Sequence, residues 1–362
     1  MVLCGTSFKF AGNLQPKNLS SPIVKFGPKT THGVRALAVA CISLLSLAAG
    51  GKRIGPTLVR DIPLPGNATR FDYQSIDSAR NLLFIAHLGD SHIVVFNVAQ
   101  RRVMATIPNV ARAHGILVIP ELGRVYASAT GTNEVVAIDE RTLTVTARAP
   151  GGVYPDGIAY DPRTQRLFVS DEHGRTVTVI DVESNKLIAT IPIGGDVGNS
   201  QYDRLSTHVF TADQTNNELV EIDPSTLAIL HRYALAGCQG SHGVFIHDTA
   251  RRAYIACQDN AKLVNFDLDT RKQLQLLPDG DSPDVLAFDT AKKILYVACE
   301  NGHVTTFAAT RGTLQPLSDT YVGPAAHTIA VDQRSHLLYL PLENLNGKPV
   351  LRIVRFNERL QK

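Results

Sequence analysis

The sequence predicts an all-β fold: a seven-bladed β-propeller with four strands in each blade. Three observations predict it. A unit of about 42 residues repeats along the chain, each unit contains four short β-type runs separated by turn residues, and the run missing from the last unit is present before the first. Four strands in about 42 residues are typical of a propeller blade.

Each unit is marked by an aromatic residue at the start of one β-type run. Successive aromatic residues lie 42, 42, 42, 44, 42 and 43 positions apart. A helical solenoid is excluded because no unit keeps an apolar period of 3.6 residues, and because β-branched and aromatic residues crowd the apolar runs. The seven segments are Phe84-Ile-Ala-His, Tyr126-Ala-Ser-Ala, Phe168-Val-Ser-Asp, Phe210-Thr-Ala-Asp, Tyr254-Ile-Ala-Cys, Tyr296-Val-Ala-Cys and Tyr339-Leu-Pro-Leu.

The unit around Phe168 shows the four runs most clearly. Between them stand Asp, Pro, Ser and Asn residues, which favour tight turns through their fixed or locally hydrogen-bonded backbone. The runs cover residues 157–161, 166–170, 176–181 and 186–191.

The two ends of the repeat array complement each other. The last unit ends at Lys362 without a fourth run, whereas residues 57–63 resemble the fourth run 102–108 of the first unit. An open ring would leave two strand edges unpaired. We therefore expect the amino-terminal strand to complete the last blade and close the ring.

Residues 1–50 differ in composition from the rest of the chain. They contain five Lys or Arg and no Asp or Glu, and the apolar run 36–49 follows Arg35 and ends in small residues, which is the order of a signal peptide. The run is shorter than the ~20 apolar residues that span a bilayer. We expect a leader over 1–50, one propeller domain over 51–362, and a periplasmic or secreted mature chain without a transmembrane span. An uncleaved anchor and a buried helix are the alternatives.

The net charge argues against one class of partner. Without the five basic residues of the leader, the chain has 31 Lys and Arg against 33 Asp and Glu, a net charge of −2. Binding to a phosphate backbone needs a basic surface. Nucleic acid is therefore not an expected partner.

Three cysteines remain after the leader: Cys238, Cys257 and Cys299. In an exported protein an odd number leaves at least one free thiol, metal ligand or intermolecular link. Cys257 and Cys299 occupy the same position of neighbouring units, farther apart than the ~7 Å between Cα atoms that a disulfide allows. A Cys238–Cys257 bridge, a Cys/His metal site and small buried residues all remain open.

Two units carry a further signature. Tyr296-Val-Ala-Cys followed by Val304-Thr-Thr-Phe, and Phe168-Val-Ser-Asp followed by Val177-Thr-Val-Ile-Asp, resemble the YVTN repeat of bacterial YncE-like propellers. The resemblance extends from residue 57 to the carboxyl end and implies the seven-bladed fold. Carriers of this repeat include surface proteins, binding proteins and lactonase-like enzymes, so the resemblance implies a fold more strongly than an activity.

Two sets of loops are expected on one face of the ring. The loops that lead into the innermost strands read Arg70-Phe-Asp72, Ala113-His-Gly115, Pro155-Asp-Gly157, Asn199-Ser-Gln201, Ser241-His-Gly243, Pro283-Asp-Val285 and Ala326-His-Thr328. Their middle position is His or Asp in five of seven units. The loops after the second strands add His87, Asp171, Glu172, His173, Asp213, Gln258, Glu300 and Glu343.

Together these residues predict a polar ring at the mouth of the central channel. Neutral imidazoles suit transition metals, whereas carboxylates suit harder ions and general-base work. We assign His114, His242 and His327 as metal ligands, Glu172, Glu300 and Glu343 as candidate catalytic residues, and the following as ligand-binding residues: Arg70, His87, Asp156, His173, Asp213, Gln258 and Asp284. The alternative is a structural role in which the inner His and Asp side chains hydrogen-bond to neighbouring blades or to turn amides.

Two functions fit this ring. The first is an exported binding propeller that holds a small molecule, a metal ion or a partner protein at the mouth, because no Gly-x-Ser-x-Gly elbow, phosphate loop, dinucleotide fingerprint or His-Glu-x-x-His motif is present. The second is a metal-dependent hydrolase, lyase or lactonase-like enzyme. The one cofactor that the ring suggests is a divalent metal ion.

Overall fold

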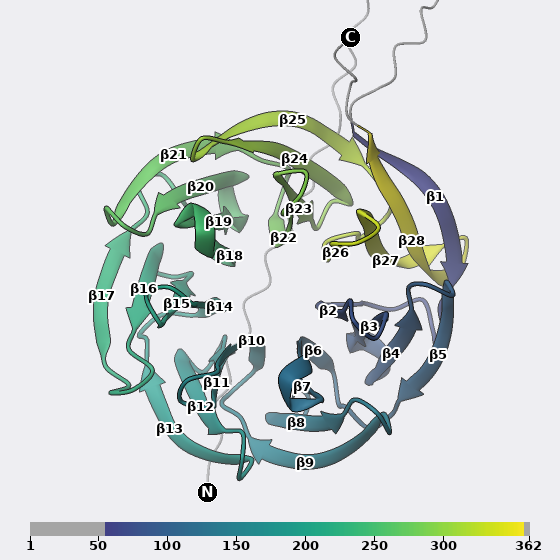
Figure 1. The fold of residues 1–362 in the computed structure, drawn as a ribbon, viewed down its shortest axis with the longest axis horizontal. Coiled ribbons are helices and arrows are strands. Elements are labelled where there is room, and N and C mark those ends of the chain that lie inside the picture. The colour runs from purple at the N-terminus through teal and green to yellow at the C-terminus, as the bar shows by residue number, and fades with distance from the viewer. Residues whose placement is uncertain (1–54, 358–362) are drawn as a thin grey trace, which may run out of the picture. The chain divides into compact units, whose positions relative to one another are not determined.

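A computed structural model describes residues 55–357, which form a ring of seven four-stranded antiparallel sheets (Figure 1). The predicted seven-bladed propeller with four strands in each blade is confirmed. The predicted leader lies outside the described residues. None of the described residues forms a helix that is long and apolar enough to cross a membrane.

In six blades the strands run in chain order from the channel to the rim (Figure 1). They are β2 (Gln74–Asp77), β3 (Leu82–His87), β4 (His92–Asn97) and β5 (Arg102–Ile107) in blade 1; β6 (Ala113–Ile119), β7 (Arg124–Ala129), β8 (Glu134–Asp139) and β9 (Thr144–Pro150) in blade 2; β10 (Pro155–Asp161), β11 (Arg166–Asp171), β12 (Thr176–Asp181) and β13 (Lys186–Pro192) in blade 3; β14 (Val197–Asp203), β15 (His208–Asp213), β16 (Glu218–Ile222) and β17 (Ile229–Ala234) in blade 4; β18 (Ser241–His247), β19 (Arg252–Cys257), β20 (Lys262–Asp267) and β21 (Lys272–Pro278) in blade 5; β22 (Pro283–Asp289), β23 (Ile294–Cys299), β24 (His303–Thr310) and β25 (Thr313–Tyr321) in blade 6.

Blade 7 is built from both ends of the described chain. It contains β26 (Ala330–Asp332), β27 (Leu337–Leu345), β28 (Lys348–Asn357) and, at the rim, β1 (Gly55–Pro63). β1 pairs antiparallel with β28, and Arg352 makes a two-pronged ion pair with Asp61 at 2.8 and 2.6 Å. Figure 1 shows purple β1 beside yellow β28. The prediction that the amino-terminal strand completes the last blade is confirmed.

The core lies between neighbouring blades. The seven aromatic residues that mark the repeat all lie on the second strands and are at most 1% exposed. By contrast, the outermost strands alternate exposed and half-buried residues, because only one of their faces covers the core. The aromatic repeat is therefore a packing device that joins one blade to the next.

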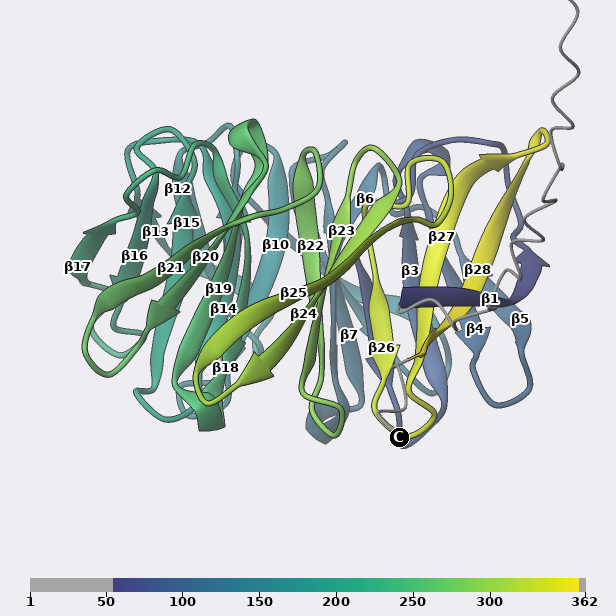
Figure 2. The same ribbon diagram turned by 90° about the horizontal axis from the view of Figure 1, so that it is seen from above.

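In five blades an aspartate ends the innermost strand, at the face of the ring opposite the predicted polar mouth. Their carboxylates accept hydrogen bonds from backbone amides two or three residues later, which fixes the turn into the second strand. These aspartates are Asp77, Asp161, Asp203, Asp289 and Asp332. Figure 2 shows the ring from the side, with loops at both faces.

Glycines let the inner strands approach one another closely. A Cβ atom added to Gly115 would lie 1.9 Å from the carbonyl oxygen of Asp156, and one added to Gly243 would lie 1.9 Å from that of Asp284. Such distances exclude any side chain at these two positions. Close approach of the inner strands brings the residues just before the glycines into contact around the channel.

Candidate functional site

One position at or just before the start of each inner strand forms a ring at the channel mouth, and in six of the seven blades its side chain is ionisable. Each ring residue stands twelve positions before the aromatic residue that marks its blade. Acidic and basic side chains alternate around the ring, with a glycine in blade 4. In order of blades, the ring is Asp72, His114, Asp156, Gly198, His242, Asp284 and His327.

The strand register corrects the sequence alignment in two blades. The alignment placed Phe71 and Ser200 in this column. The structure pairs Val197 with Asp213 as it pairs Pro155 with Asp171, so Gly198 is the counterpart of Asp156. In blade 1 the same comparison gives Asp72, because Gln74 pairs with Ile85 as Ile158 pairs with Val169.

His114 lies between two carboxylates. Its Nε2 atom is 3.0 Å from Asp72 Oδ2 and 3.6 Å from Asp156 Oδ1, and its Nδ1 atom is 3.3 Å from Thr130 Oγ1. Burial lowers the pKa of His114, but Asp156 and Asp72 outweigh burial and raise the pKa to about 9. Without a bound cation, this imidazole carries a proton at neutral pH.

His242 and His327 repeat the arrangement. His242 lies 3.2 Å from Asp284 and 3.9 Å from Asp156, and His327 lies 3.8 Å from Asp72 and 3.6 Å from Glu300. Burial lowers the pKa of His242, but Asp284 and Asp156 raise it to about 10. Each ring histidine therefore contacts two carboxylates.

Several buried polar atoms of the ring accept or donate no hydrogen bond within the described chain. They include both carboxylate oxygens of Asp156, Nδ1 of His242, Oδ1 of Asp284 and Nε2 of His327. Ion-pair distances of 3.6–3.9 Å at Asp156 and at Nε2 of His327 allow attraction but are too long for hydrogen bonds, and the 3.2 Å contact between His242 and Asp284 does not have hydrogen-bond geometry. Because a buried polar atom without a partner is costly, these atoms favour a bound group at the mouth.

A second layer of side chains lies above the ring. Arg70, with 38% of its side chain exposed, donates to Glu300 at 2.7 and 3.2 Å and to Asp72 at 3.2 Å. Glu343 is half-buried, and burial raises its pKa although His327 and Arg70 oppose the rise. Cationic and acidic groups thus share one side of the mouth.

Tyr73 lies across the channel beneath the ring. Its hydroxyl donates a 2.7 Å hydrogen bond to Oδ1 of Asn199, which comes from blade 4. Both residues line a cavity of about 150 Å³ between the inner strands. The Tyr73–Asn199 contact therefore bridges distant blades just below the ring.

Donor atoms at the mouth gather into two groups, in each of which the atoms lie within 4.8 Å of one another. One contains Asp72, His114 and Asp156, and the other Asp284, Glu300 and His327. In the described part of the chain, no such group unites the three histidines assigned as ligands. His242 belongs to neither group.

The other predicted residues lie around this centre. Glu172 is half-buried near the mouth and contributes to the raised pKa of His242. His173 is exposed in the loop between β11 and β12, where its ring lies tilted against that of Tyr154 with centroids 4.4 Å apart. Gln258 begins the short 3-10 helix η4 (Gln258–Asn260).

Asp213 and His87 have local partners away from the ring. Asp213 is fully buried and accepts hydrogen bonds from the backbone and side chain of Asn216, which accounts for it as a turn residue of blade 4. His87 lies with Asp90 and His92 in a third group of donor atoms.

Sequence reasoning missed Asp72, Tyr73, Asn199, Asp90 and His92. Asp72 had a signal, because its twelve-residue offset from Phe84 equals that of the other ring residues. Asp90 and His92 also had one, because His87-Leu-Gly-Asp-Ser-His92 places three potential ligands within six residues. Tyr73 and Asn199 had none, since their contact depends on the closed ring.

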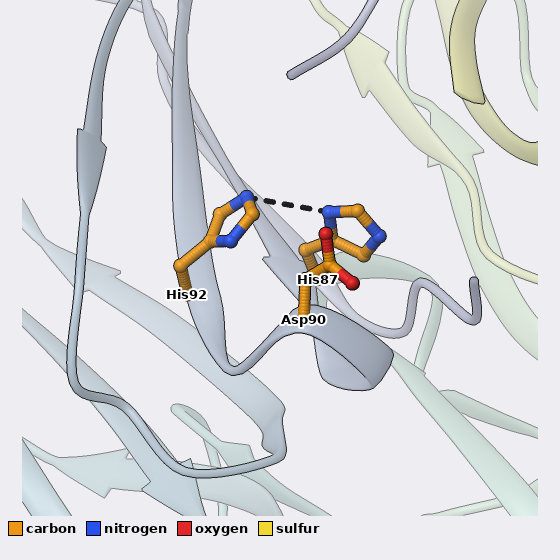
Figure 3. A group of neighbouring side chains, drawn as sticks. All are labelled: His87, Asp90 and His92. Carbon is orange, nitrogen blue, oxygen red and sulfur yellow. Dashed lines mark hydrogen bonds between the residues drawn. The ribbon is translucent and has the colours of Figure 1, made fainter. Parts of the chain in front are cut away.

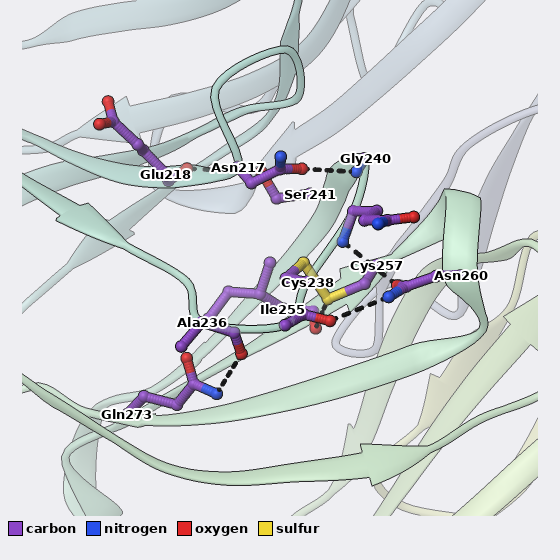
Figure 4. The surroundings of a disulfide bond; sticks show 12 residues. Asn217, Glu218, Ala236, Cys238, Gly240, Ser241, Ile255, Cys257, Asn260 and Gln273 are labelled. Carbon is purple, nitrogen blue, oxygen red and sulfur yellow. Dashed lines mark hydrogen bonds between the residues drawn. A yellow bond between two sulfur atoms is a disulfide. The ribbon is translucent and has the colours of Figure 1, made fainter.

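The structure resolves the alternatives for the cysteines. Cys238 and Cys257 form a disulfide with Cα atoms 5.3 Å apart, and Cys299 is a buried free thiol. Figure 4 shows the bridge beside Asn260, which donates to the carbonyl oxygen of Gly237 and accepts from the amide of Gln239. The bridge and Asn260 together fix the loop that leads into β18.

Comparison with known proteins supports the fold. No family model matches the chain, and no curated protein sequence matches it significantly. Among solved structures, the chain is similar to hydrazine synthase of Kuenenia stuttgartiensis (TM-score 0.69, 12% identity, covering 82% of this chain and 97% of that chain). It is also similar to streptogramin B lyase, with a TM-score of 0.70 and 10% identity, covering 84% of this chain and 98% of that chain. Virginiamycin B lyase from Staphylococcus aureus gives a TM-score of 0.68 and 11% identity, covering 81% of this chain and 98% of that chain. At these identities the likeness shows a propeller fold and no function.

Proposed function

We propose that this chain is an exported, YncE-like propeller that binds a divalent metal ion, together with a small ligand, at the channel mouth. The observation that carries the proposal is the group of Asp72, His114 and Asp156. These three side chains are at most 7% exposed, come from three neighbouring blades, and offer donor atoms within 4.8 Å of one another. Both Asp156 oxygens lack hydrogen bonds in the described structure.

The distances within this group suit one ion. Ligand atoms bound at 2.0–2.2 Å to one metal lie about 3.0–3.5 Å apart, and His114 Nε2 lies 3.0 and 3.6 Å from the two carboxylates. One imidazole and two carboxylates suit Zn²⁺, Mn²⁺ or Fe²⁺. Thr130, at 3.3 Å from His114 Nδ1, would orient the imidazole as an outer partner.

The second group at the mouth is a poorer cation site. Its Glu300 is already neutralised by Arg70 at 2.7 Å. Arg70 pairs with both Glu300 and Asp72, yet 38% of its side chain is exposed and open to a ligand. A ligand with a carboxylate or phosphate group could face Arg70 while another of its oxygen atoms reaches the metal.

Export is supported by two features. The composition of residues 1–50 is that of a signal peptide, and the Cys238–Cys257 disulfide is of a kind that persists in oxidising compartments. Membership of the YncE-like group is supported by the repeat motif and the propeller fold.

Calorimetric titration of the untagged, chelator-treated protein with Zn²⁺ and Mn²⁺ tests the metal site. We expect saturable binding that Asp156→Asn weakens at least tenfold, because this change removes the carboxylate shared by two histidines. His231→Gln, an exposed residue on β17, is the matched control. Equal binding by the wild-type protein and a folded Asp156→Asn variant would overturn the proposal and leave the ring a purely structural network.

A metal-dependent hydrolase or lyase is the second candidate. It is favoured by Glu343, a half-buried carboxylic acid whose pKa is raised at the same mouth and which therefore suits proton transfer. Metal-loaded protein would be screened against esters, lactones and polyoxygenated substrates, with Glu343→Gln expected to lower turnover at least 100-fold. Exposed Glu121→Gln serves as the control. Full activity of Glu343→Gln would remove this residue from the mechanism.

A further inference from the structure

A second cluster of potential ligands lies in blade 1, away from the ring. His87 and His92 face each other with Nδ1 of His87 3.3 Å from Nε2 of His92, and the carboxylate of Asp90 lies beside them (Figure 3). The donor atoms of the three residues lie within 4.8 Å of one another. The proposed function makes no use of them.

The β3–β4 hairpin builds this cluster. His87 is the last residue of β3 and pairs directly with His92, the first residue of β4. Between them, the 3-10 helix η1 (Leu88–Asp90) carries Asp90, and Ser91 closes the turn with a φ of 56°. Because the two histidines form a cross-strand pair, their side chains lie on the same face of the blade.

The surroundings hold the His87 ring in one orientation. The side chain is fully buried, and its ring stacks on Phe71 with centroids 3.9 Å apart. On the side away from His92, Nε2 of His87 lies 3.0 Å from the hydroxyl of Thr69. The orientation of Nδ1 toward His92 is therefore fixed before any ligand binds.

The hydrogen-bond network also assigns the tautomer of His87. Thr69 donates its single hydroxyl proton to Oδ1 of Asp90 at 3.0 Å, because a carboxylate can only accept. The contact between Thr69 and His87 must then use a proton on Nε2. Nδ1 of His87 therefore presents its lone pair toward His92, as a metal ligand does, while Thr69 takes the place of the outer partner that orients ligating histidines.

The distance between the two imidazoles matches a shared ion. Two ligands bound at about 2.0–2.1 Å to a tetrahedral metal lie about 3.3 Å apart. Asp90 can supply a third ligand, although its oxygens also accept hydrogen bonds from Thr69 and from the backbone and side chain of Asn67. The side-chain amide of Asn67 is shared between both oxygens at 3.2 and 3.3 Å, and an ion bound to Asp90 would replace this weak contact.

The cluster opens into a groove between blades 1 and 2. The groove has a volume of about 610 Å³ and is lined in part by Asp90, His92, Thr132 and Arg148. Three protein ligands leave at least one position of a metal ion for an exchangeable group, whereas a structural site has four. Arg148 lines the same groove, where it pairs with Glu134 at 2.9 Å and donates to the carbonyl oxygen of Asn109.

We propose that His87, Asp90 and His92 form a second metal site for Zn²⁺ or Cu²⁺, with an open coordination position that takes an anionic oxygen ligand from the groove. Two imidazoles and one carboxylate suit these borderline ions. The ring group, with one imidazole and two carboxylates, suits Mn²⁺ and Fe²⁺ as well as Zn²⁺. The site lies within a single hairpin and needs no contribution from the channel.

Zn²⁺ titration of the untagged, full-length protein tests the site, with stoichiometry read by calorimetry and geometry by the visible absorption of Co²⁺. His92→Gln is the main variant, because His92 is half-exposed and its replacement spares the core. We expect this variant to lose one equivalent of Zn²⁺ and its share of the Co²⁺ bands. His231→Gln should change neither.

Thr69→Val tests the role of the tautomer. It keeps the shape of Thr69 but removes the hydroxyl that accepts from His87, so we expect Zn²⁺ affinity to fall 10- to 100-fold. Thr69→Ser, which restores the hydroxyl, should recover the affinity. A purely structural role for Thr69 would not produce this recovery, and equal affinity of all three proteins would contradict the assigned tautomer and its part in the site.

The two variants test the two proposed metal sites independently. Loss of one Zn²⁺ equivalent in His92→Gln with normal binding in Asp156→Asn supports the hairpin site and overturns the ring site. Unchanged stoichiometry and affinity in His92→Gln overturns the hairpin site, whatever Asp156→Asn shows.

Discussion

At the scale of single residues, the arrangement of charges around the mouth identifies the side chains on which the proposed metal binding depends. Asp156 contacts both His114 and His242, and it lies in the column that the sequence identified in five blades. The residue types of that column could be predicted, because a fixed offset from the aromatic residue repeats in every blade. The contacts between these side chains could not be predicted, because the distances across the mouth depend on how closely the seven inner strands approach one another.

Glu140 lies away from the mouth and tests how burial and neighbouring charges change the pKa of a carboxyl group in this fold. Burial and the neighbouring Asp77 raise the pKa of Glu140 to about 7, although the guanidinium of Arg80 contacts it and opposes the rise. Its pKa in the unfolded chain is near 4.5. The protonated form therefore stabilises the fold fully below about pH 4.5, and this contribution is lost as the pH rises through 7.

We expect the free energy of unfolding of the wild-type protein to fall between pH 5 and pH 8 more steeply than that of Glu140→Gln. Urea unfolding at both pH values measures the difference, and exposed Glu121→Gln should follow the wild-type slope. Parallel slopes for the wild-type protein and Glu140→Gln would contradict the raised pKa.

At the scale of strands and blades, the repeat made most of the fold predictable. The number of blades, the four strands in each, and the pairing of the first strand with the last all followed from the repeat and its ends. The strand register predicted from the sequence was wrong only in blades 1 and 4, where residues that mark the register in other blades are missing. Blade 4 has Gly198 in the ring column, and blade 1 has Tyr73 where three other blades have Gly115, Gly157 and Gly243. A small slip in such a strand changes which side chains face the channel.

Gly115→Ala tests the close approach of the inner strands. The added Cβ would lie 1.9 Å from a backbone carbonyl of blade 3, which cannot move without shifting Asp156. We expect a loss of about 1–3 kcal/mol in stability, typical of overpacking, and weaker metal binding at the mouth. Gly151→Ala, whose Cβ would come no closer than 3.3 Å to another atom, is the control. Equal stability of the two variants would show that the inner strands have more room than described.

The disulfide of blade 5 gives a second test at this scale. A bridge across 19 residues is worth about 3 kcal/mol by restricting the unfolded chain. We expect a reducing agent to lower the unfolding midpoint of the wild-type protein but not that of the Cys238→Ser, Cys257→Ser double variant. Cys299, which is buried, should react with thiol reagents only after unfolding. A midpoint insensitive to reduction would show that the bridge contributes nothing to stability.

At the scale of the whole molecule, the ring site joins parts of the chain that the repeat keeps separate. Asp72, His114 and Asp156 belong to blades 1, 2 and 3, so a bound ion would tie three blades together, whereas the hairpin cluster lies within blade 1 alone. An ion present at 100 times its dissociation constant would stabilise the folded state by about 2.7 kcal/mol. The alternation of acid and base around the mouth explains how the ring tolerates burial before such an ion binds.

The most direct test is the metal content of the untagged protein, purified from its native compartment and dialysed against a weak chelator. Mass spectrometry of the digested sample should find about one equivalent more of divalent metal in the wild-type protein than in the Asp156→Asn variant. A folded protein with no divalent metal, or with metal that Asp156→Asn retains in full, would contradict the assignment of the mouth as a metal site.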